Sequence, residues 1–307
     1  MAIKCFSVDY SMSNEQGTFS SGDRLTGRVT LVLSRDITLQ SLSVEAIGKA
    51  EVKWTEPDGK NVVVYSEKEK YFCLRTLLQE GKGDGSEVVT AGQHVYPFTF
   101  HIPAKGMPSS YVGKWGKITY CLEVKLIRTL WQIDEVKKEF PFLSKAVMII
   151  AGLREPQCVS KIVYFASGKI SMDIHIEMMG YKPGEAIQVI VQIHNNSTRP
   201  VTPNFYLFEK QSFFAKRRRK VYTNDIIKEI GDPVPAGSNQ TVTKVLTVPP
   251  HIPITFLDCS IIKLEYRLKV SLDVPVAKDP EVKLPLVILL DKSKVAEKRL
   301  QEYSWSK

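Results

Sequence analysis

The most concentrated chemistry in this sequence is a run of five cations, Lys216-Arg-Arg-Arg-Lys220, flanked by aromatic residues. Adjacent cations repel one another unless water or an anion faces them. The flanks Phe213-Phe214 and Val221-Tyr222 favour the tip of a β-hairpin over a floppy tail. Each Lys or Arg contributes about 1 kcal/mol near an anionic leaflet, so the run predicts peripheral contact with phosphoinositide headgroups. The predicted site comprises Lys216, Arg217, Arg218, Arg219 and Lys220, with Lys210 adding to it.

Two other interpretations of this run stay open. Charge runs are more often solvated loops without a ligand than binding sites, by roughly two to one. A nuclear localisation signal has the same composition. Nucleic-acid binding ranks low, because the base-stacking aromatics that RRM and OB modules carry at sheet-surface spacing are missing.

Residues able to perform catalysis or to bind a metal are scattered. The five histidines form no HExxH or HxH pair, and the five cysteines show no CxxC or Cys/His ligand spacing. A GxSxG elbow, a Walker loop and a two-carboxylate signature are also missing. We therefore expect a protein that is not an enzyme and binds no metal or cofactor, with a hydrolase built from separated residues as a distant alternative. The thiols are expected to be small buried side chains, and His175 to be solvated.

The composition points to a folded chain of about two domains. Its 307 residues are too many for one ordinary core, and 43% hydrophobic with 24% charged residues excludes wholesale disorder. No stretch approaches the roughly 18 consecutive apolar residues of a membrane span. The first ten residues lack an apolar signal region, and Ala2 stands where myristoylation needs glycine, so we expect an intracellular protein without a lipid anchor at this end. The net charge of +9 permits weak attraction to anionic surfaces without choosing among them.

Alternation with a period of two dominates the sequence. Successive side chains of a strand point to opposite faces, so an alternating segment has one buried and one wetted side. This pattern predicts an all-β chain of antiparallel sheets stacked face to face. Between Leu39 and Leu42 the alternating apolar residues change from odd-numbered to even-numbered positions, which a β-bulge would explain. The alternating segments are Leu25–Leu33, Ile118–Leu126, Ile170–Met178 and Ile262–Leu272.

Few segments fall outside this pattern. Tyr71 to Glu80 is ambiguous between helix and strand, and Asp291 to Lys307 is polar and permits a helix. Gly81-Lys-Gly-Asp-Gly85 is expected to be a mobile loop and not a phosphate cradle. The tryptophans are expected in the core or at its rim, and they are Trp54, Trp115, Trp131 and Trp305.

The two halves of the chain repeat the same elements in the same order. A glycine-acid turn feeds a strand at Gly22-Asp23 and again at Gly184-Glu185. A His-Ile-Pro segment precedes an alternating strand at His101 and again at His251. The repeat predicts two tandem antiparallel immunoglobulin-like β-sandwiches. We place the first sandwich at residues 1–145, an interdomain linker at 146–158, the second sandwich at 159–290 and a short polar tail at 291–307.

These segments resemble the arrestin fold, and most of all the α-arrestin family of arrestin domain-containing proteins and thioredoxin-interacting protein. The likeness covers nearly the whole chain. In the first half it is carried by Gly22-Asp-Arg-Leu-Thr-Gly27, Tyr96-Pro-Phe-Thr-Phe-His-Ile-Pro103 and Gly116-Lys-Ile-Thr-Tyr120. In the second half it is carried by Tyr181-Lys-Pro-Gly-Glu185, Asp258-Cys-Ser-Ile-Ile-Lys-Leu-Glu-Tyr266 and Leu284-Pro-Leu-Val-Ile288.

The resemblance implies a non-enzymatic adaptor. Such a protein binds cytoplasmic tails of membrane receptors or transporters and links them to endocytic sorting, protein transport and ubiquitination. It is cytoplasmic and peripheral at the plasma membrane and endosomes. α-Arrestins usually carry Pro-Pro-x-Tyr motifs that WW domains of ubiquitin ligases bind. Here Pro249-Pro250 is followed by His251-Ile252, so either the tail that carries the motif lies outside this sequence or contact with ubiquitin ligase machinery is indirect.

An alternative implied by the same resemblance is a thiol-dependent redox or signalling regulator like thioredoxin-interacting protein. That protein has a reactive cysteine in a late loop of its second domain. The comparable stretch here, Lys228 to Gln240, contains no cysteine. Cys259 matches another family cysteine, which is expected to be buried at the foot of a strand.

The resemblance also gives the candidate binding residues a place. The basic run is similar in position to the hairpin where better-known arrestins bind inositol phosphates. In an arrestin-like sandwich the first strand lies along the concave face, where an acidic or phosphorylated cargo peptide can add as a further strand. Lys4, Arg24 and Arg28 are the candidate cargo-binding residues, against the simpler interpretation that Arg24 and Arg28 only occupy a wetted strand face.

Overall fold

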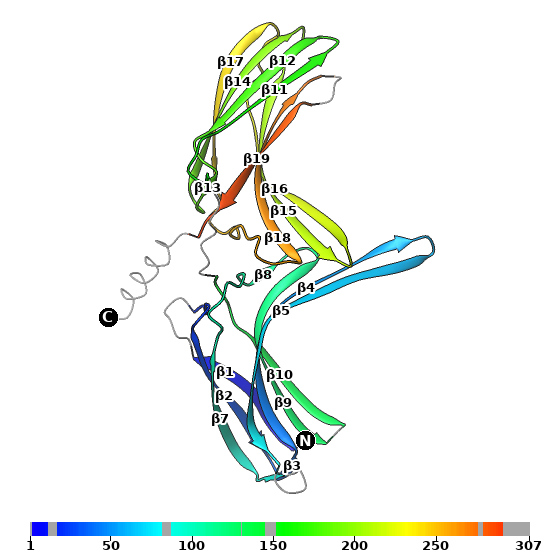
Figure 1. The fold of residues 1–307 in the computed structure, drawn as a ribbon, viewed down its shortest axis with the longest axis vertical. Coiled ribbons are helices and arrows are strands. Elements are labelled where there is room, and N and C mark those ends of the chain that lie inside the picture. Colours follow the sequence, from blue (N-terminus) through cyan, green and yellow to red (C-terminus); the bar gives the residue numbers. More distant parts are fainter. Residues whose placement is uncertain are drawn as a thin grey trace, which may run out of the picture.

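The computed structural model describes residues 2–11, 17–81, 87–129, 131–144, 152–275 and 279–290 of the chain. Figure 1 shows them as two β-sandwiches stacked end to end along the long axis of the molecule. Across these ranges there is no helix, and so none long and apolar enough to cross a membrane. The expected all-β fold of two sandwiches is confirmed.

The first sandwich packs a three-stranded sheet against a larger one. The smaller sheet has the order β1 (Ile3–Ser11), β2 (Arg24–Leu33), β7 (Gly92–His101). The larger sheet has the order β10 (Gln132–Glu139), β9 (Gly116–Thr129), β4 (Ser41–Asp58), β5 (Asn61–Glu80), with β8 (Tyr111–Val112) beside β9. A separate pair joins β3 (Ile37–Leu39) to β6 (Glu87–Val89).

The second sandwich has the same two-layer plan. One sheet has the order β11 (Gln157–Phe165), β12 (Gly168–Ile176), β14 (Ala186–Ser197), β17 (Ser238–Thr247). The other has the order β13 (Gly180–Tyr181), β19 (Glu281–Ile288), β18 (Ile262–Asp273), β15 (Thr202–Ala215), β16 (Arg218–Ile230). The strands pair antiparallel except β13 with β19.

The alternating residues build the two cores. Along β18 the apolar positions from Ile262 to Leu272 are buried, while Lys263, Glu265 and the other polar positions up to Lys269 are partly exposed. β9 departs from the expected single buried face, because its polar side is buried as well. Glu123 on that side is only 7% exposed, and Lys137 Nζ on the neighbouring β10 lies 3.1 Å from its Oε1.

The internal repeat is confirmed by matching hydrogen bonds in the two glycine-acid turns. In the first turn the Asp23 carboxylate accepts a bond from the Ser20 N–H at 2.8 Å. In the second the Glu185 carboxylate accepts from the Lys182 N–H, also at 2.8 Å. Each turn holds a glycine in the left-handed region, with φ of 83° and 91°. A side chain at these positions would strain the turn, which explains the repeated glycine.

A second pair of matching hydrogen bonds joins a tyrosine of the alternating strand to a proline carbonyl in or shortly after the His-Ile-Pro segment. The Tyr120 hydroxyl donates to the Pro108 carbonyl at 2.6 Å in the first sandwich. The Tyr266 hydroxyl donates to the Pro253 carbonyl at 2.7 Å in the second. Both rings are almost fully buried, so these bonds satisfy hydroxyls that would otherwise be costly to bury.

Several sequence-based expectations need correction. The parity slip after Leu39 is not a bulge: the chain leaves the β3–β6 pair there and enters β4, which belongs to another sheet. Tyr71 to Glu80 is part of strand β5. Trp131 is 92% exposed, so it belongs neither to the core nor to its rim, whereas Trp54 is 4% exposed. Of the remaining expectations, those on 82–85, 146–151, Trp305 and the tail 291–307 lie outside the described residues.

The proposed domain limits stay a prediction. The strands of the first sandwich end at Glu139, and those of the second begin at Gln157, two residues before the predicted start of the second sandwich.

Candidate functional site

The basic run lies at the tip of the β15–β16 hairpin, as its aromatic flanks predicted. Ala215 pairs with Arg218, which leaves Lys216 and Arg217 as a two-residue loop. Both loop residues have positive φ, 48° and 62°. This combination defines a type I′ turn, which normally carries Asn or Gly. The turn places two long cationic side chains at the end of the hairpin.

The five cations at this tip have different partners. Lys216 Nζ donates to the Val64 carbonyl on β5 at 3.0 Å. Lys220 Nζ lies 3.3 Å from Glu56 Oε1 on β4. Both residues therefore reach across to the first sandwich, where the β4–β5 hairpin extends to the same side (Figure 1).

Among the described residues, the other three cations of the run bond to no residue of the first sandwich. Arg219 donates to the Ser212 hydroxyl at 2.9 Å and lies over the Phe214 ring. Arg217 and Arg218 are exposed, and within the described ranges their side chains have no hydrogen-bond or ion-pair partner. The charge available to an external anion is therefore concentrated on these two arginines.

Lys210 lies within the sheet, away from the tip. Its Nζ is 2.8 Å from Glu265 Oε2 on the adjacent β18, and its side chain is only 19% exposed. Partial burial raises the pKa of Glu265, but the hydrogen bond and charge of Lys210, with Arg267, lower the pKa below its usual value overall. The Lys210 ammonium is thus already paired within the protein, and an external ligand would have to compete with Glu265 for it.

Aromatic contacts hold the two sandwiches together beside the basic tip. The Trp115 ring meets Phe213 and Tyr222 edge-on, with centroids 5.6 Å and 6.0 Å away. Lys220 Nζ lies 4.9 Å from the centre of the same Trp115 ring. Tyr111 meets Phe256 edge-on at 5.0 Å. We call this contact region, from both sandwiches, the junction.

Polar bonds complete the junction. The Glu69 carboxylate on β5 accepts from the Ser260 N–H at 2.8 Å and from the Ser260 hydroxyl at 2.7 Å. The Lys114 N–H donates to Gln211 Oε1 at 2.9 Å. Cys259 is 1% exposed here, as expected, and burial raises the pKa of its thiol to about 11. The junction therefore combines apolar packing with directed bonds, which fix orientation as well as position.

The candidate cargo-binding residues line the smaller sheet of the first sandwich. Arg24 and Arg28 are exposed on the outward face of β2. Lys4 is also exposed, at a bulge where β1 opposes Val32, so it lies at the other end of β2 from Arg24. At ~3.3 Å per residue this spacing is about 26 Å. The three cations form a line along the strand direction and not one cluster.

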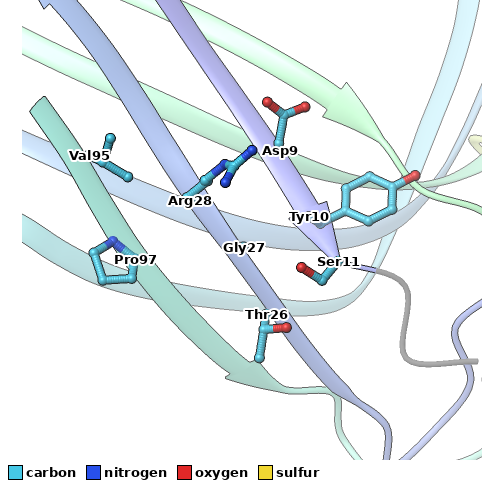
Figure 2. A pocket seen from close by; sticks show the side chains of 8 residues that line it. All are labelled: Asp9, Tyr10, Ser11, Thr26, Gly27, Arg28, Val95 and Pro97. Atoms are coloured by element: carbon cyan, nitrogen blue, oxygen red, sulfur yellow. The ribbon is translucent and has the colours of Figure 1, made fainter. Parts of the chain in front are cut away.

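A shallow hollow of about 410 Å³ lies beside Arg28 on this outward face (Figure 2). Arg28 and Asp9 face each other across β2 and β1. The hydrogen bond and charge of Lys138, with a smaller effect of Arg28, lower the pKa of Asp9 below its usual value. The hollow is lined by Asp9, Tyr10, Ser11, Thr26, Gly27, Arg28, Val95 and Pro97.

β1 is an edge strand of its sheet. No strand pairs with its other side in the part of the chain that the structure describes. β10 lies beside the last residues of β1, where Lys138 Nζ is 2.6 Å from Asp9 Oδ1 and the Tyr10 hydroxyl donates to the Glu139 carbonyl at 3.4 Å. The edge of β1 can therefore receive an extended peptide.

The scattered histidines and cysteines form a Cys–His pair but no metal-binding group among the described residues. Among the described residues no group of three or more His, Cys, Asp or Glu side chains is placed to hold a metal ion. One pair escaped the sequence analysis: Cys158 Sγ lies 3.0 Å from His175 Nδ1, so His175 is not merely solvated. Each lies seven residues from the β11–β12 turn, and recognising that turn as a hairpin would have predicted the contact. The expectation of five buried thiols is also wrong, because Cys5, Cys73 and Cys158 are exposed.

Comparison with known proteins gives this fold its class. Residues 7–148 match the arrestin (or S-antigen) N-terminal domain family, and residues 166–292 match the arrestin (or S-antigen) C-terminal domain family. The molecule is therefore an arrestin-fold protein, with one domain of each kind.

Individual relatives identify the family within the arrestin-fold class. Arrestin domain-containing protein 4 of Homo sapiens is 33% identical over 287 residues, which cover 89% of this chain and 68% of the relative. The Mus musculus protein of the same name is 32% identical over 286 residues, covering 89% and 69%. Thioredoxin-interacting protein of Mus musculus is 25% identical over 297 residues, covering 93% and 73%. The chain belongs to the α-arrestin family, whose members are of the adaptor type.

Proposed function

We propose that this α-arrestin is an adaptor that binds cytoplasmic segments of membrane receptors or transporters on its first sandwich. The observation that carries the proposal is the combination of an unpaired β1 edge with the exposed Arg24 and Arg28 beside it. Backbone groups of β1 supply hydrogen bonds to any extended peptide, and the arginines favour acidic or phosphorylated ones. Binding of this kind needs no catalytic group.

The proposal assigns the second sandwich to membrane contact. Arg217 and Arg218 project from the β15–β16 tip without partners of their own among the described residues, which supports contact with anionic headgroups. The protein would then work at the cytoplasmic side of the plasma membrane and of endosomes. The junction keeps the tip and the cargo-binding face in a fixed relation, because Lys216 in the tip loop and Lys220 on β16 both contact the β4–β5 hairpin of the first sandwich.

The downstream part of the proposal is delivery of bound cargo to endocytic sorting, protein transport and ubiquitination. Within the sequence given, Pro249-Pro250 lacks the tyrosine that WW domains require, so contact between these residues and a ubiquitin ligase would need an intermediary.

The cargo-binding part is tested by proximity labelling in cells with paired charge-reversal variants. Arg24→Glu with Arg28→Glu reverses the proposed face. Arg35→Glu with Lys60→Glu introduces the same charge change at exposed residues elsewhere on the first sandwich. We expect the first variant to lose membrane proteins from the labelled set and the control to keep them. Equal labelling by wild type and both variants would refute the cargo-binding face.

The membrane part is tested with vesicles of phosphatidylcholine containing phosphatidylserine and a phosphoinositide. Arg217→Ala with Arg218→Ala removes two free charges, at about 1 kcal/mol each, so we expect about 30-fold weaker binding. Lys216→Ala with Lys220→Ala removes two charges that already have partners, and we expect a smaller loss. Equal losses for the two variants, or none, would contradict this assignment.

A further inference from the structure

We infer that Cys158 is a reactive thiol, activated by His175, that accepts low-molecular-weight disulfides of the glutathione type. The site lies on the outward face of the β11–β12–β14–β17 sheet, which carries neither the β15–β16 tip nor the proposed cargo-binding face. It would make the second sandwich a place where this adaptor is reversibly modified.

The strand register creates the pair. β11 and β12 form a hairpin in which Phe165 pairs with Gly168, and counting back from that turn places Cys158 directly opposite His175. Directly opposite side chains share one face of the sheet, about 5 Å apart at their Cβ atoms. Their contact atoms, Sγ and Nδ1, are 3.0 Å apart.

The thiol is also accessible. Cys158 is exposed, and β11 is an edge strand whose outer side carries no pairing strand within the described ranges. A hollow of about 260 Å³ opens on the same face. It is lined by Cys158, Val159, Ser160, Asp173, Ile174, His175, Ile190 and Gln192, and it leaves room for the group that the thiol would acquire.

A nucleophile within hydrogen-bond reach of a base is the arrangement that activates a thiol. The imidazole of His175 can take the thiol proton and stabilise the thiolate, which is the reacting form. The other four cysteines lack this arrangement: in the structure as described, no histidine contacts Cys5 or Cys73, and Cys121 and Cys259 are buried. Burial raises the pKa of the Cys121 and Cys259 thiols to about 11.

The reaction balances without any further reagent. The Cys158 thiol passes its proton to His175 Nδ1, and the thiolate attacks one sulfur of the small disulfide. A new sulfur–sulfur bond forms, the old one breaks, and the leaving thiolate takes the proton from His175. The protein thiol and the disulfide thus become a mixed disulfide and one free small thiol, and excess small thiol reverses the exchange.

The chain supplies its own controls for a test with oxidised glutathione and mass spectrometry of each cysteine. In the wild-type chain we expect Cys158 to be modified about fivefold faster than Cys5 or Cys73, since an unperturbed thiol is only a few per cent thiolate at pH 7. His175→Gln should lower the Cys158 rate to that of Cys73. His194→Gln removes another imidazole of this sheet, 4.0 Å from Asp173 and not in contact with Cys158, and should leave the rate unchanged.

Two results would overturn the inference. One is a wild-type Cys158 that reacts no faster than Cys5 and Cys73, a comparison that needs no variant. The other is an unchanged Cys158 rate in His175→Gln. Modification of the buried Cys121 and Cys259 reports any loss of the fold, so a damaged variant is recognised in the same spectra.

Discussion

The junction between the two sandwiches and their outer faces use the same residue types in different ways. Trp115 is partly buried and contacts Phe213, Tyr222 and the Lys220 ammonium, whereas Trp131 just before the start of β10 is 92% exposed. Lys220 has a carboxylate partner across the junction, whereas Arg218, two residues earlier, has no partner among the described side chains.

The number of charged residues in a run therefore does not give the number of charges that a binding site offers to a ligand. Cations at the junction stabilise the contact between the sandwiches, and only those pointing outward remain for a ligand. Matched substitutions, one at the junction and one on an outer face, test this distinction.

The largest effect is expected from the two tryptophans. Trp115→Ala should lower the free energy of unfolding by about 2–3 kcal/mol, because it removes aromatic contacts from both sandwiches at once. Trp131→Ala should change it by less than about 0.5 kcal/mol. Urea unfolding followed by circular dichroism measures both.

The shape of the unfolding curve adds a second readout. If the junction couples the sandwiches, its loss should separate one transition into two, since two-state behaviour fails when domains unfold independently. Similar effects of Trp115→Ala and Trp131→Ala would show that the junction does not stabilise the molecule.

A smaller effect is expected from a polar pair of substitutions on β5. Glu69→Ala removes the acceptor of two Ser260 hydrogen bonds and should cost about 1–2 kcal/mol. Glu67→Ala, two residues earlier on the same strand, removes an exposed carboxylate that accepts a 3.4 Å bond from the adjacent Lys68 N–H, and should cost less than about 0.5 kcal/mol.

Small-angle scattering distinguishes a loosened junction from a weakened sandwich. Glu69→Ala should increase the spread of distances between the sandwiches, while Glu67→Ala leaves the profile of the wild type. An unchanged profile for Glu69→Ala would assign its bonds to local stability alone.

Much of the fold could be predicted because its causes are local. Along Ile262–Leu272 every second side chain is apolar and lies in the core, so the buried face of β18 can be predicted from the sequence. The repeat was visible because the glycine-acid turns need the same residue types in both sandwiches.

The contacts between the sandwiches could not be predicted in this way. Lys216 and its acceptor Val64 are 152 residues apart, and no local pattern fixes how two sandwiches pack. Lys210 was assigned to the basic site because of its sequence position, but the neighbouring β18 supplies Glu265, 55 residues later, as its partner. Burial of both faces of β9 likewise depends on strands on either side of it.

The smallest effect is expected at an exposed ion pair between the edge strands β1 and β10 of the first sandwich. Lys138 lowers the pKa of Asp9, chiefly through its hydrogen bond and then through its charge. Both side chains are more than 40% exposed, so solvent screening should limit the loss in Lys138→Gln to less than about 0.5 kcal/mol.

The sign of the pH dependence follows from the direction of that shift. Because the pKa of Asp9 is lowered from 3.8 in the folded protein, the pair stabilises the fold above pH 3.8, and this contribution is lost as the pH falls through the folded value. Lys138→Gln should raise the pKa of Asp9 in a carbon-13 titration and remove this acid-dependent part. Lys137→Gln, whose ammonium contacts Glu123 instead, should leave the Asp9 titration unchanged. A loss at neutral pH as large as that of Glu69→Ala would mean that this outer edge stabilises the molecule as strongly as the junction does.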